Sequence, residues 1–192
     1  MENKKVIKSV RILKENSRFV KEAKKIIYPH YVVKNGIDGL AHIEHVTHIG
    51  MEIAERECRD DSDTDLLGIT LGCLLHDIGR GNEKKGQKHG EAGVEISKEI
   101  LKQYFIGYNI DVEKVLYAIS HHDLGQVSKD KLIGGIWDAD RLSLYRFKGR
   151  EIDLNRLSTE AAKELLEYSK RYIAMRMKDY EINFETGEEP ER

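Results

Sequence analysis

The chain has 192 residues, of which 40% are hydrophobic and 34% are charged, and only two are prolines. These proportions exclude collagen-like and low-complexity classes and leave enough apolar residues for a packed core. The 32 basic and 34 acidic residues give a net charge of −2, so no global basic field is present to bind polymeric nucleic acid. The uncharged run 66–75 is too short to span a bilayer, and the N-terminus lacks the apolar region of a secretory signal. The two cysteines are too few for a disulfide framework. We therefore expect a cytoplasmic protein without a membrane or nucleic-acid partner.

The spacing of apolar residues predicts an all-α fold, and no stretch alternates long enough to require a sheet. The first predicted helix, 4–28, is amphipathic and basic and ends before Pro29. We interpret its lysines as a solvated face rather than as a surface for an anionic partner. Further helices are predicted at 40–57, 64–78, 89–106, 111–122, 129–145 and 158–180. We expect one domain over 1–185, with a motif-bearing core at about 38–147 and a mobile tail at 186–192.

The chain has eight histidines, and helix geometry predicts which of them face a core. At about 100° per residue, His42 falls inside the apolar arc of its helix, His45 lies on the border of that arc, and His48 lies outside it. A lone inward histidine is more often a satisfied core residue than a ligand, so His42 alone is weak evidence. His30 and His48 are interpreted as bystanders.

A histidine and an aspartate directly follow the most apolar predicted helix. Residues 66–75 are apolar all round, which predicts the buried centre of the fold, and His76 and Asp77 come next. A buried carboxylate is costly unless it is paired or bound to a metal. The alternative is an aspartate that emerges into water before Gly79.

Three more polar side chains face inward by the same geometry. His89 shares a face with small and apolar residues, and His122 lies near the edge of an apolar arc with His121 roughly opposite. Asp140 lies in the middle of an apolar stripe, whereas Asp138 faces away from that stripe.

Together, the inward polar groups come from five predicted helices: His42, His76, Asp77, His89, His122 and Asp140. Neutral imidazoles and carboxylates suit divalent ions such as Zn, Mn, Fe or Ni. Helical folds also build dimetal sites by converging such groups in their core. The sequence therefore predicts a metal site at the centre of a helical bundle.

The order of these residues resembles the HD-domain superfamily of metal-dependent phosphohydrolases, over about residues 38–147. The signature of that family is a His, then a His-Asp pair, then a distant Asp. It matches His42, the His76-Asp77-Ile78-Gly79 motif, and Asp140 within Trp137-Asp138-Ala139-Asp140-Arg141-Leu142.

Two further histidines match the members of the family that hold two metals, namely His89 and His122, with His121 as the alternative to His122. Many members carry an arginine where this chain has His45, so the role of that arginine is not transferred. The cyclic-di-nucleotide phosphodiesterase branch carries a Gly-Tyr-Pro segment after the paired histidines. Here residues 123–126 read Asp-Leu-Gly-Gln, which disfavours that branch.

The resemblance implies an HD-domain bundle that hydrolyses a phosphate ester of a nucleotide or another small phosphorylated metabolite. It implies one or two divalent ions, with Mn, Fe, Zn, Ni and Mg not distinguished. It assigns catalysis to Asp77 and His76, with Asp77 bridging two metals. The implied ligands of the first metal are His42, His76, Asp77 and Asp140, and those of the second are Asp77, His89 and His122.

A phosphorylated substrate also requires cations or donors outside the metal ligands. The candidates for substrate binding are Arg80, Lys84, His121 and Arg141. For the two arginines, a solvated surface charge is an equally weighted alternative, and for Lys84 it is the favoured one. His121 directly precedes the predicted ligand His122, and Arg141 directly follows the predicted ligand Asp140.

Two other functions use a similar residue set. A minority of the family holds two irons and oxidises small organic substrates with O₂, and a regulatory module could bind a nucleotide without turnover. The polar loop 81–88 favours a phosphorylated substrate over the oxidase reading. An oligomer is compatible with the sequence but is not predicted by it.

Overall fold

The structure is a computed structural model that describes residues 18–58 and 63–177. Within these residues it is all-helical, which confirms the predicted fold class. Residues 18–27 are helical, and the later elements are η1 (Tyr28–His30), α2 (Leu40–Glu57), α3 (Asp63–Leu75), α4 (His89–Tyr104), α5 (Val112–His121), η2 (His122–Leu124), α6 (Lys131–Leu142), η3 (Ser143–Arg146), η4 (Leu154–Arg156), α7 (Glu160–Glu164) and α8 (Leu166–Arg176). The predicted residues 4–17 of the first helix and the tail 186–192 lie outside the described residues.

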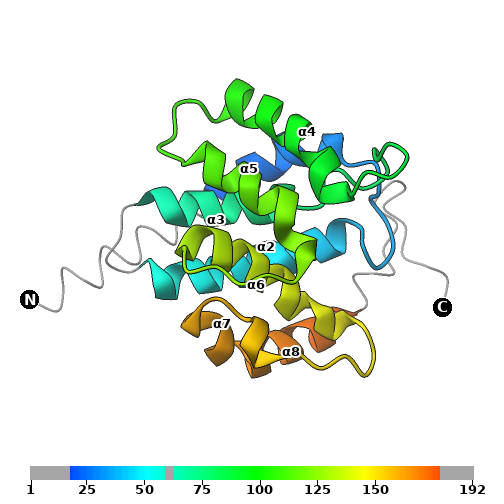
Figure 1. The fold of residues 1–192 in the computed structure, drawn as a ribbon, viewed down its shortest axis with the longest axis vertical. Helices are drawn as coiled ribbons and strands as arrows, with labels where there is room; N and C mark the ends of the chain where they lie inside the picture. The colour runs from blue at the N-terminus through cyan, green and yellow to red at the C-terminus, as the bar shows by residue number, and fades with distance from the viewer. Residues whose placement is uncertain (1–17, 59–62, 178–192) are drawn as a thin grey trace, which may run out of the picture.

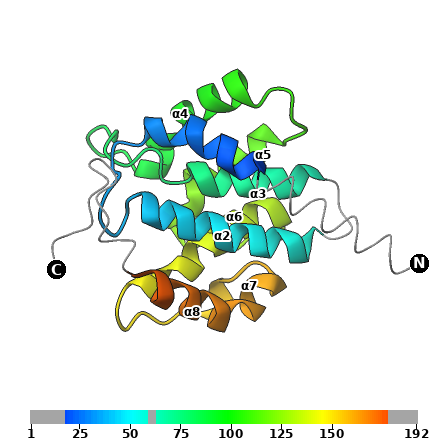
Figure 2. The ribbon, with the colours of Figure 1, turned by 180° about the vertical axis from the view of Figure 1, so that it is seen from behind.

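Helices α2, α3 and α6 form the middle of the fold and contact one another (Figure 1). Helices α4 and α5 pack together on one side of this group, and α7 and α8 lie on the other side (Figure 1). Seen from behind, the helix at 18–27 lies beside α3 and α4 (Figure 2). None of the helices within the described residues combines the length and the apolar character needed to cross a membrane.

Helix α3 is the buried centre that its apolar sequence predicts, with Ile69, Leu71 and Leu74 fully buried. Two glycines on one face of α3 allow α6 to approach closely. A Cβ atom on Gly68 would lie 2.5 Å from Leu132 Cδ1, and one on Gly72 would lie 2.2 Å from Ile136 Cδ1. Real side chains do not pack at these distances, so a side chain at either position would force Leu132 or Ile136 of α6 to move.

Two predicted helices end differently in the structure. The helix predicted at 129–145 ends as α6 at Leu142 and continues as the 3-10 helix η3. Ser143 Oγ donates to the Asp140 carbonyl at 2.6 Å, and such back-bonding by serine competes with the regular helical bond. The helix predicted at 158–180 is divided into α7 and α8 at Leu165, whose N–H is shared between two carbonyl oxygens of the preceding turn.

Asp138 corrects one expectation about orientation. The apolar stripe of α6 placed Asp138 on the outward face, but its side chain is fully buried. The segment before α7 covers this second face of α6, and the Asp138 carboxylate accepts bonds from Ser158 N at 2.9 Å and from Thr159 N at 2.7 Å. Asp138 therefore anchors the 158–159 segment to α6 rather than facing solvent.

Candidate metal centre

Six side chains from five parts of the chain meet at the centre of the fold, as the sequence predicts. We call them the His/Asp cluster: His42, His76, Asp77, His89, His122 and Asp140. His42 lies on α2 and Asp140 on α6, whereas the other four lie where a helix begins or where the chain leaves one. Two subsets, His42 with His76 and Asp77, and Asp77 with His89 and His122, place their donor atoms close enough to hold a metal ion.

Asp77 is the central residue, because its two carboxylate oxygens face two different pairs of histidines. Oδ2 lies 3.4 Å from His42 Nε2 and 3.6 Å from His76 Nε2. Oδ1 lies 3.2 Å from His89 Nε2 and 3.3 Å from His122 Nε2. This is the arrangement that a carboxylate needs to contact two cations at once, one with each oxygen.

Within each pair, the two histidine Nε2 atoms also face each other. The separation is 3.2 Å between His42 and His76 and 2.9 Å between His89 and His122. Asp140 Oδ1 completes the first pair, at 3.3 Å from His42 Nε2 and 3.7 Å from His76 Nε2. The first group thus offers two imidazoles and two carboxylates, and the second offers two imidazoles and one carboxylate.

The opposite ring nitrogens fix which tautomer the histidines adopt. His76 Nδ1 lies 2.8 Å from the Cys73 carbonyl, and His122 Nδ1 lies 2.8 Å from the Ile119 carbonyl. A carbonyl can only accept, so each Nδ1 carries the proton and each neutral ring presents a lone pair at Nε2. Metal-binding histidines are commonly oriented by this kind of bond.

A divalent cation fits the polar groups that the fold buries here. Asp77 Oδ1 is buried and accepts no hydrogen bond within the described residues. Uncompensated burial of a carboxylate oxygen is costly, and a metal ion compensates for it. Four imidazoles and two carboxylates are also the donor types that suit Mn, Fe, Zn or Ni.

The electrostatics keep the carboxylates ionised and one histidine neutral. Burial alone would raise the pKa of Asp77, but the neighbouring His76 and the nearby rings of His122, His42 and His89 hold that pKa well below its ordinary value. Burial lowers the pKa of His76 to about 4, so this ring is neutral near pH 7. Burial also lowers the pKa of His122, but the Asp77 carboxylate 3.3 Å from its Nε2 outweighs this effect and raises the pKa to about 8. A bound metal would compete with the proton on His122.

Behind the first pair lies a set of buried polar residues that sequence reasoning did not find. Ser143 Oγ lies 3.4 Å from His42 Nδ1, and Arg146 Nη1 donates to Ser143 Oγ at 2.7 Å. Arg146 Nη2 donates to Asp38 Oδ1 at 2.9 Å. Ser143 follows Asp140 by one helical turn, so its position near the site could have been inferred, but the contact with Asp38 comes from a loop distant in sequence.

Of the predicted substrate-binding residues, the structure brings Arg80 to the cluster. Arg80 Nε donates to Asp77 Oδ2 at 2.6 Å, and the side chain is 28% exposed, so the guanidinium also reaches toward solvent. Lys84 is exposed on the loop between α3 and α4. The ring of His121 stacks on Tyr117 with centroids 4.2 Å apart, and its Nδ1 lies 3.0 Å from the Tyr117 carbonyl.

Arg141 makes its described contacts away from the cluster. It donates to the Arg156 carbonyl at 2.7 Å and to the Gln126 carbonyl, and it lies 3.4 Å from Asp138. These bonds tie two loops to α6. His45, which helix geometry places on the border of the apolar arc, is fully buried beside Tyr172. The Nε2 atom of His48, interpreted as a bystander, lies 2.7 Å from the Tyr168 hydroxyl.

Gly79 explains how the second pair reaches Asp77. A Cβ atom at position 79 would lie 2.0 Å from the His89 carbonyl oxygen and 2.4 Å from Gly93 N. The first turn of α4 therefore packs directly on the backbone that follows Asp77. This close approach sets the 3.2 Å distance from His89 Nε2 to Asp77 Oδ1.

Comparison with known proteins gives one match. A family model described as HD domain matches residues 39–166, which is two thirds of the chain and contains the whole His/Asp cluster. No curated protein matches the chain, and no solved structure matches it.

Proposed function

Because this chain belongs to the HD-domain family, we propose that it is a metal-dependent phosphohydrolase that cleaves a phosphate ester of a nucleotide or another small phosphorylated metabolite. The observation that carries this proposal is the placement of Asp77 between two pairs of histidines, with one carboxylate oxygen toward each pair. Family membership supports the reaction class, and the geometry supports a centre for two ions.

In this proposal the first ion is held by His42, His76, Asp77 and Asp140, and the second by Asp77, His89 and His122. Divalent ions held there would polarise the phosphoryl group and lower the pKa of a water nucleophile toward neutrality. The chain's own contribution is to keep His76 neutral, to keep Asp77 ionised and to fix the directions of the lone pairs.

Arg80 is the residue that we assign to the substrate's phosphate. Its Nε is bound to Asp77, while the partial exposure of the side chain leaves the other guanidinium donors room to bind a phosphoryl oxygen. Its position favours hydrolysis over oxidation of an uncharged substrate, because a cation fixed beside the centre stabilises added negative charge. Lys84, His121 and Arg141 remain candidates for a substrate role, and their contacts support it less than those of Arg80.

The test is a metal and activity measurement on protein purified without a chelator. We expect up to two divalent ions per chain and hydrolysis of phosphomonoester or phosphodiester substrates, at the same rate with and without oxygen. Asp77→Asn should lose bound metal and nearly all activity, whereas Asp153→Asn, at an exposed position, should retain both.

Each contrary result has a clear meaning. An Asp77→Asn variant with wild-type metal content and activity would refute the metal centre. Turnover that requires O₂ would support the oxidase alternative, and bound metal with no turnover on nucleotide and sugar-phosphate panels would support a regulatory module.

A further inference from the structure

A second concave site lies outside the His/Asp cluster, where η3 and the segment after it face α8. The cavity has a volume of about 490 Å³, within the range of pockets that hold small molecules. None of the cluster residues lines it. Its walls come from residues 145–151 and from Lys170, Ile173, Ala174 and Met177.

The charge of this pocket is opposite to that of the whole chain. Four cations line it, Arg146, Lys148, Arg150 and Lys170, against a single acidic residue, Glu151. The chain as a whole carries a net charge of −2. A concave surface that concentrates one sign of charge attracts small ions of the opposite sign.

Three of these cations are not neutralised by acidic partners. Within the described residues, Lys148, Arg150 and Lys170 form no ion pair with a carboxylate. Lys170 Nζ lies 5.6 Å from the centre of the Tyr145 ring, a contact that holds the ammonium at the pocket wall without cancelling its charge.

Arg146 gives the pocket a rigid inner wall. Its side chain is only 4% exposed, is held by Asp38 and Ser143, and stacks on the Phe147 ring with 4.4 Å from Cζ to the ring centre. Its Nε is buried and has no hydrogen-bond partner within the described residues. A buried guanidinium with an unused donor favours an anion beside it.

We propose that this basic pocket is a second binding site, for a small molecule that carries two or more phosphate groups. Cations on two separate elements, η3 with its following loop and α8, suit a ligand with several negative charges rather than a single one. The volume accommodates a molecule of nucleotide size. The inference does not depend on hydrolysis at the His/Asp cluster, because it uses none of the cluster residues.

The test is titration calorimetry on full-length protein freed of metal with EDTA and then dialysed, so that the cluster holds no cation for the probe. Inorganic tripolyphosphate and ATP are the two probes, each measured at low salt and at 0.15 M salt. We expect wild-type protein to bind both, with weaker binding at the higher salt. The double variant Lys148→Gln, Lys170→Gln should weaken binding at least tenfold.

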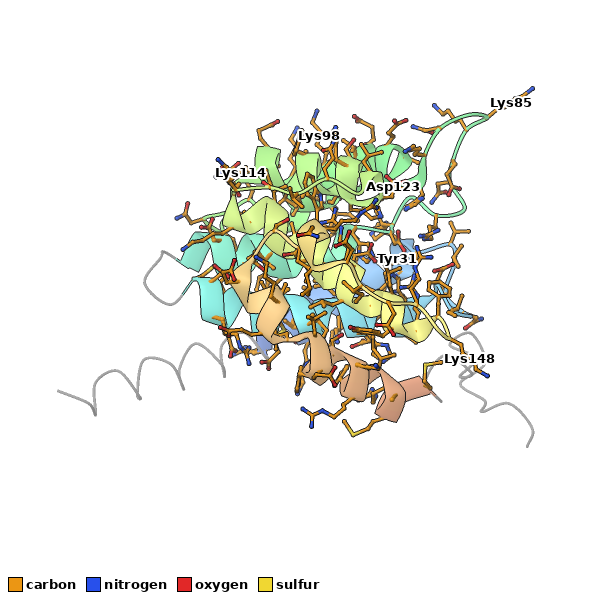
Figure 3. All side chains as sticks on the ribbon, turned by 60° about the horizontal axis from the view of Figure 1, so that its bottom comes forward. Tyr31, Lys85, Lys98, Lys114, Asp123 and Lys148 are labelled. Atoms are coloured by element: carbon orange, nitrogen blue, oxygen red, sulfur yellow. The ribbon has the colours of Figure 1, made fainter. Side chains whose placement is uncertain are left out.

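Two control variants locate the bound anion. Lys98→Gln removes an exposed lysine on α4, which lies on the opposite side of the molecule from Lys148 (Figure 3), and it should bind as the wild type does. Arg80→Gln removes the cation beside the cluster, and the double lysine variant should lose at least tenfold more affinity than Arg80→Gln does. Circular dichroism verifies that all variants fold.

Three outcomes would overturn the proposal. The first is no binding of either probe by wild-type protein at millimolar concentration, and the second is wild-type affinity in the double lysine variant. The third is a loss in Arg80→Gln as large as that in the double variant, because the anion would then be bound at the cluster.

Discussion

Replacing Gly79 with alanine tests whether the close packing of α4 on the backbone after Asp77 holds the second half of the metal centre. The added Cβ would lie 2.0 Å from the His89 carbonyl oxygen and 2.4 Å from Gly93 N. Both atoms belong to the backbone, so no side-chain rotation relieves the contact. Side-chain carbons essentially never approach other heavy atoms within 3.0 Å, so the two segments must separate by roughly 1 Å.

That displacement is large compared with what a metal site tolerates. Metal–ligand distances must hold to within about 0.2 Å. The displacement caused by Gly79→Ala moves His89, whose Nε2 lies 3.2 Å from Asp77 Oδ1. The proposed centre holds up to two ions in the wild type, and we expect the variant to lose the ion proposed at Asp77, His89 and His122. Overpacking of this kind typically costs 1–3 kcal/mol, and because backbone must move here we expect about 2–3 kcal/mol.

The assays are metal content after dialysis and urea unfolding of the metal-free protein. Gly107→Ala is the matched control, because a Cβ there meets no atom within 4 Å. Its free energy of unfolding should lie within about 0.5 kcal/mol of the wild-type value, and its metal content within about one tenth of an ion per chain. A Gly79→Ala protein with wild-type stability and two bound ions would refute the claim that this glycine positions α4.

Three further predictions follow from other contacts. Ser143→Ala removes the hydroxyl beside His42 Nδ1 and should weaken metal binding about tenfold in a chelator competition, while unchanged affinity would show that Ser143 does not orient His42. Asp130→Ala removes the N-cap of α6 and should cost about 1 kcal/mol, whereas Asp130→Asn keeps the cap. Partial burial raises the pKa of Asp130, but the bond from Lys114 outweighs this effect, and the net result is a lowered pKa. The ionised carboxylate therefore stabilises the fold above its unfolded pKa of about 3.9, and this stabilisation is lost as the pH falls through the lower folded value. The stability difference between wild type and Asp130→Asn in urea should therefore shrink between pH 6 and pH 3.5, and a difference that grows would contradict this sign. Finally, EDTA should lower the melting temperature by about 8–16 °C relative to protein with metal at 1,000 times its Kd, and an unchanged melting temperature would mean that no metal binds the folded state.

The sequence predicts the cluster well because of where its residues lie in their helices. His42 and Asp140 interrupt apolar stripes at helical spacing, and Asp77 follows a helix that is apolar all round. The cost of burying a polar residue in such a place must be compensated by a partner, so the predicted burial itself indicates a ligand. The contact between Arg146 and Asp38 has no such signal, because the two residues lie 108 positions apart and both lie outside the α-helices.

Hydrophobic periodicity predicts orientation less well where a helix is covered on two sides. It assigns one apolar face to each helix, but the Asp138 side of α6 is covered by the segment before α7, which carries its own backbone donors. Similarly, His48 was expected to be peripheral, and its ring stacks on Tyr172 of α8 with centroids 4.1 Å apart. In both cases the second contact is polar or aromatic, so hydrophobic periodicity alone does not reveal it.

The same burial that makes the cluster predictable also links folding to metal binding. Folding brings the Nε2 atoms of His89 and His122 to within 2.9 Å of each other and leaves Asp77 Oδ1 buried without a hydrogen bond. The second arrangement costs free energy in the absence of a cation, because a carboxylate oxygen is then taken out of water without a compensating hydrogen bond. The apolar packing of α3 against α2 and α6 must offset that cost in the metal-free protein. Metal binding removes this cost. Hydrogen exchange at the His89 and His122 amides, with and without metal, measures how far the metal-free cluster relaxes to reduce it.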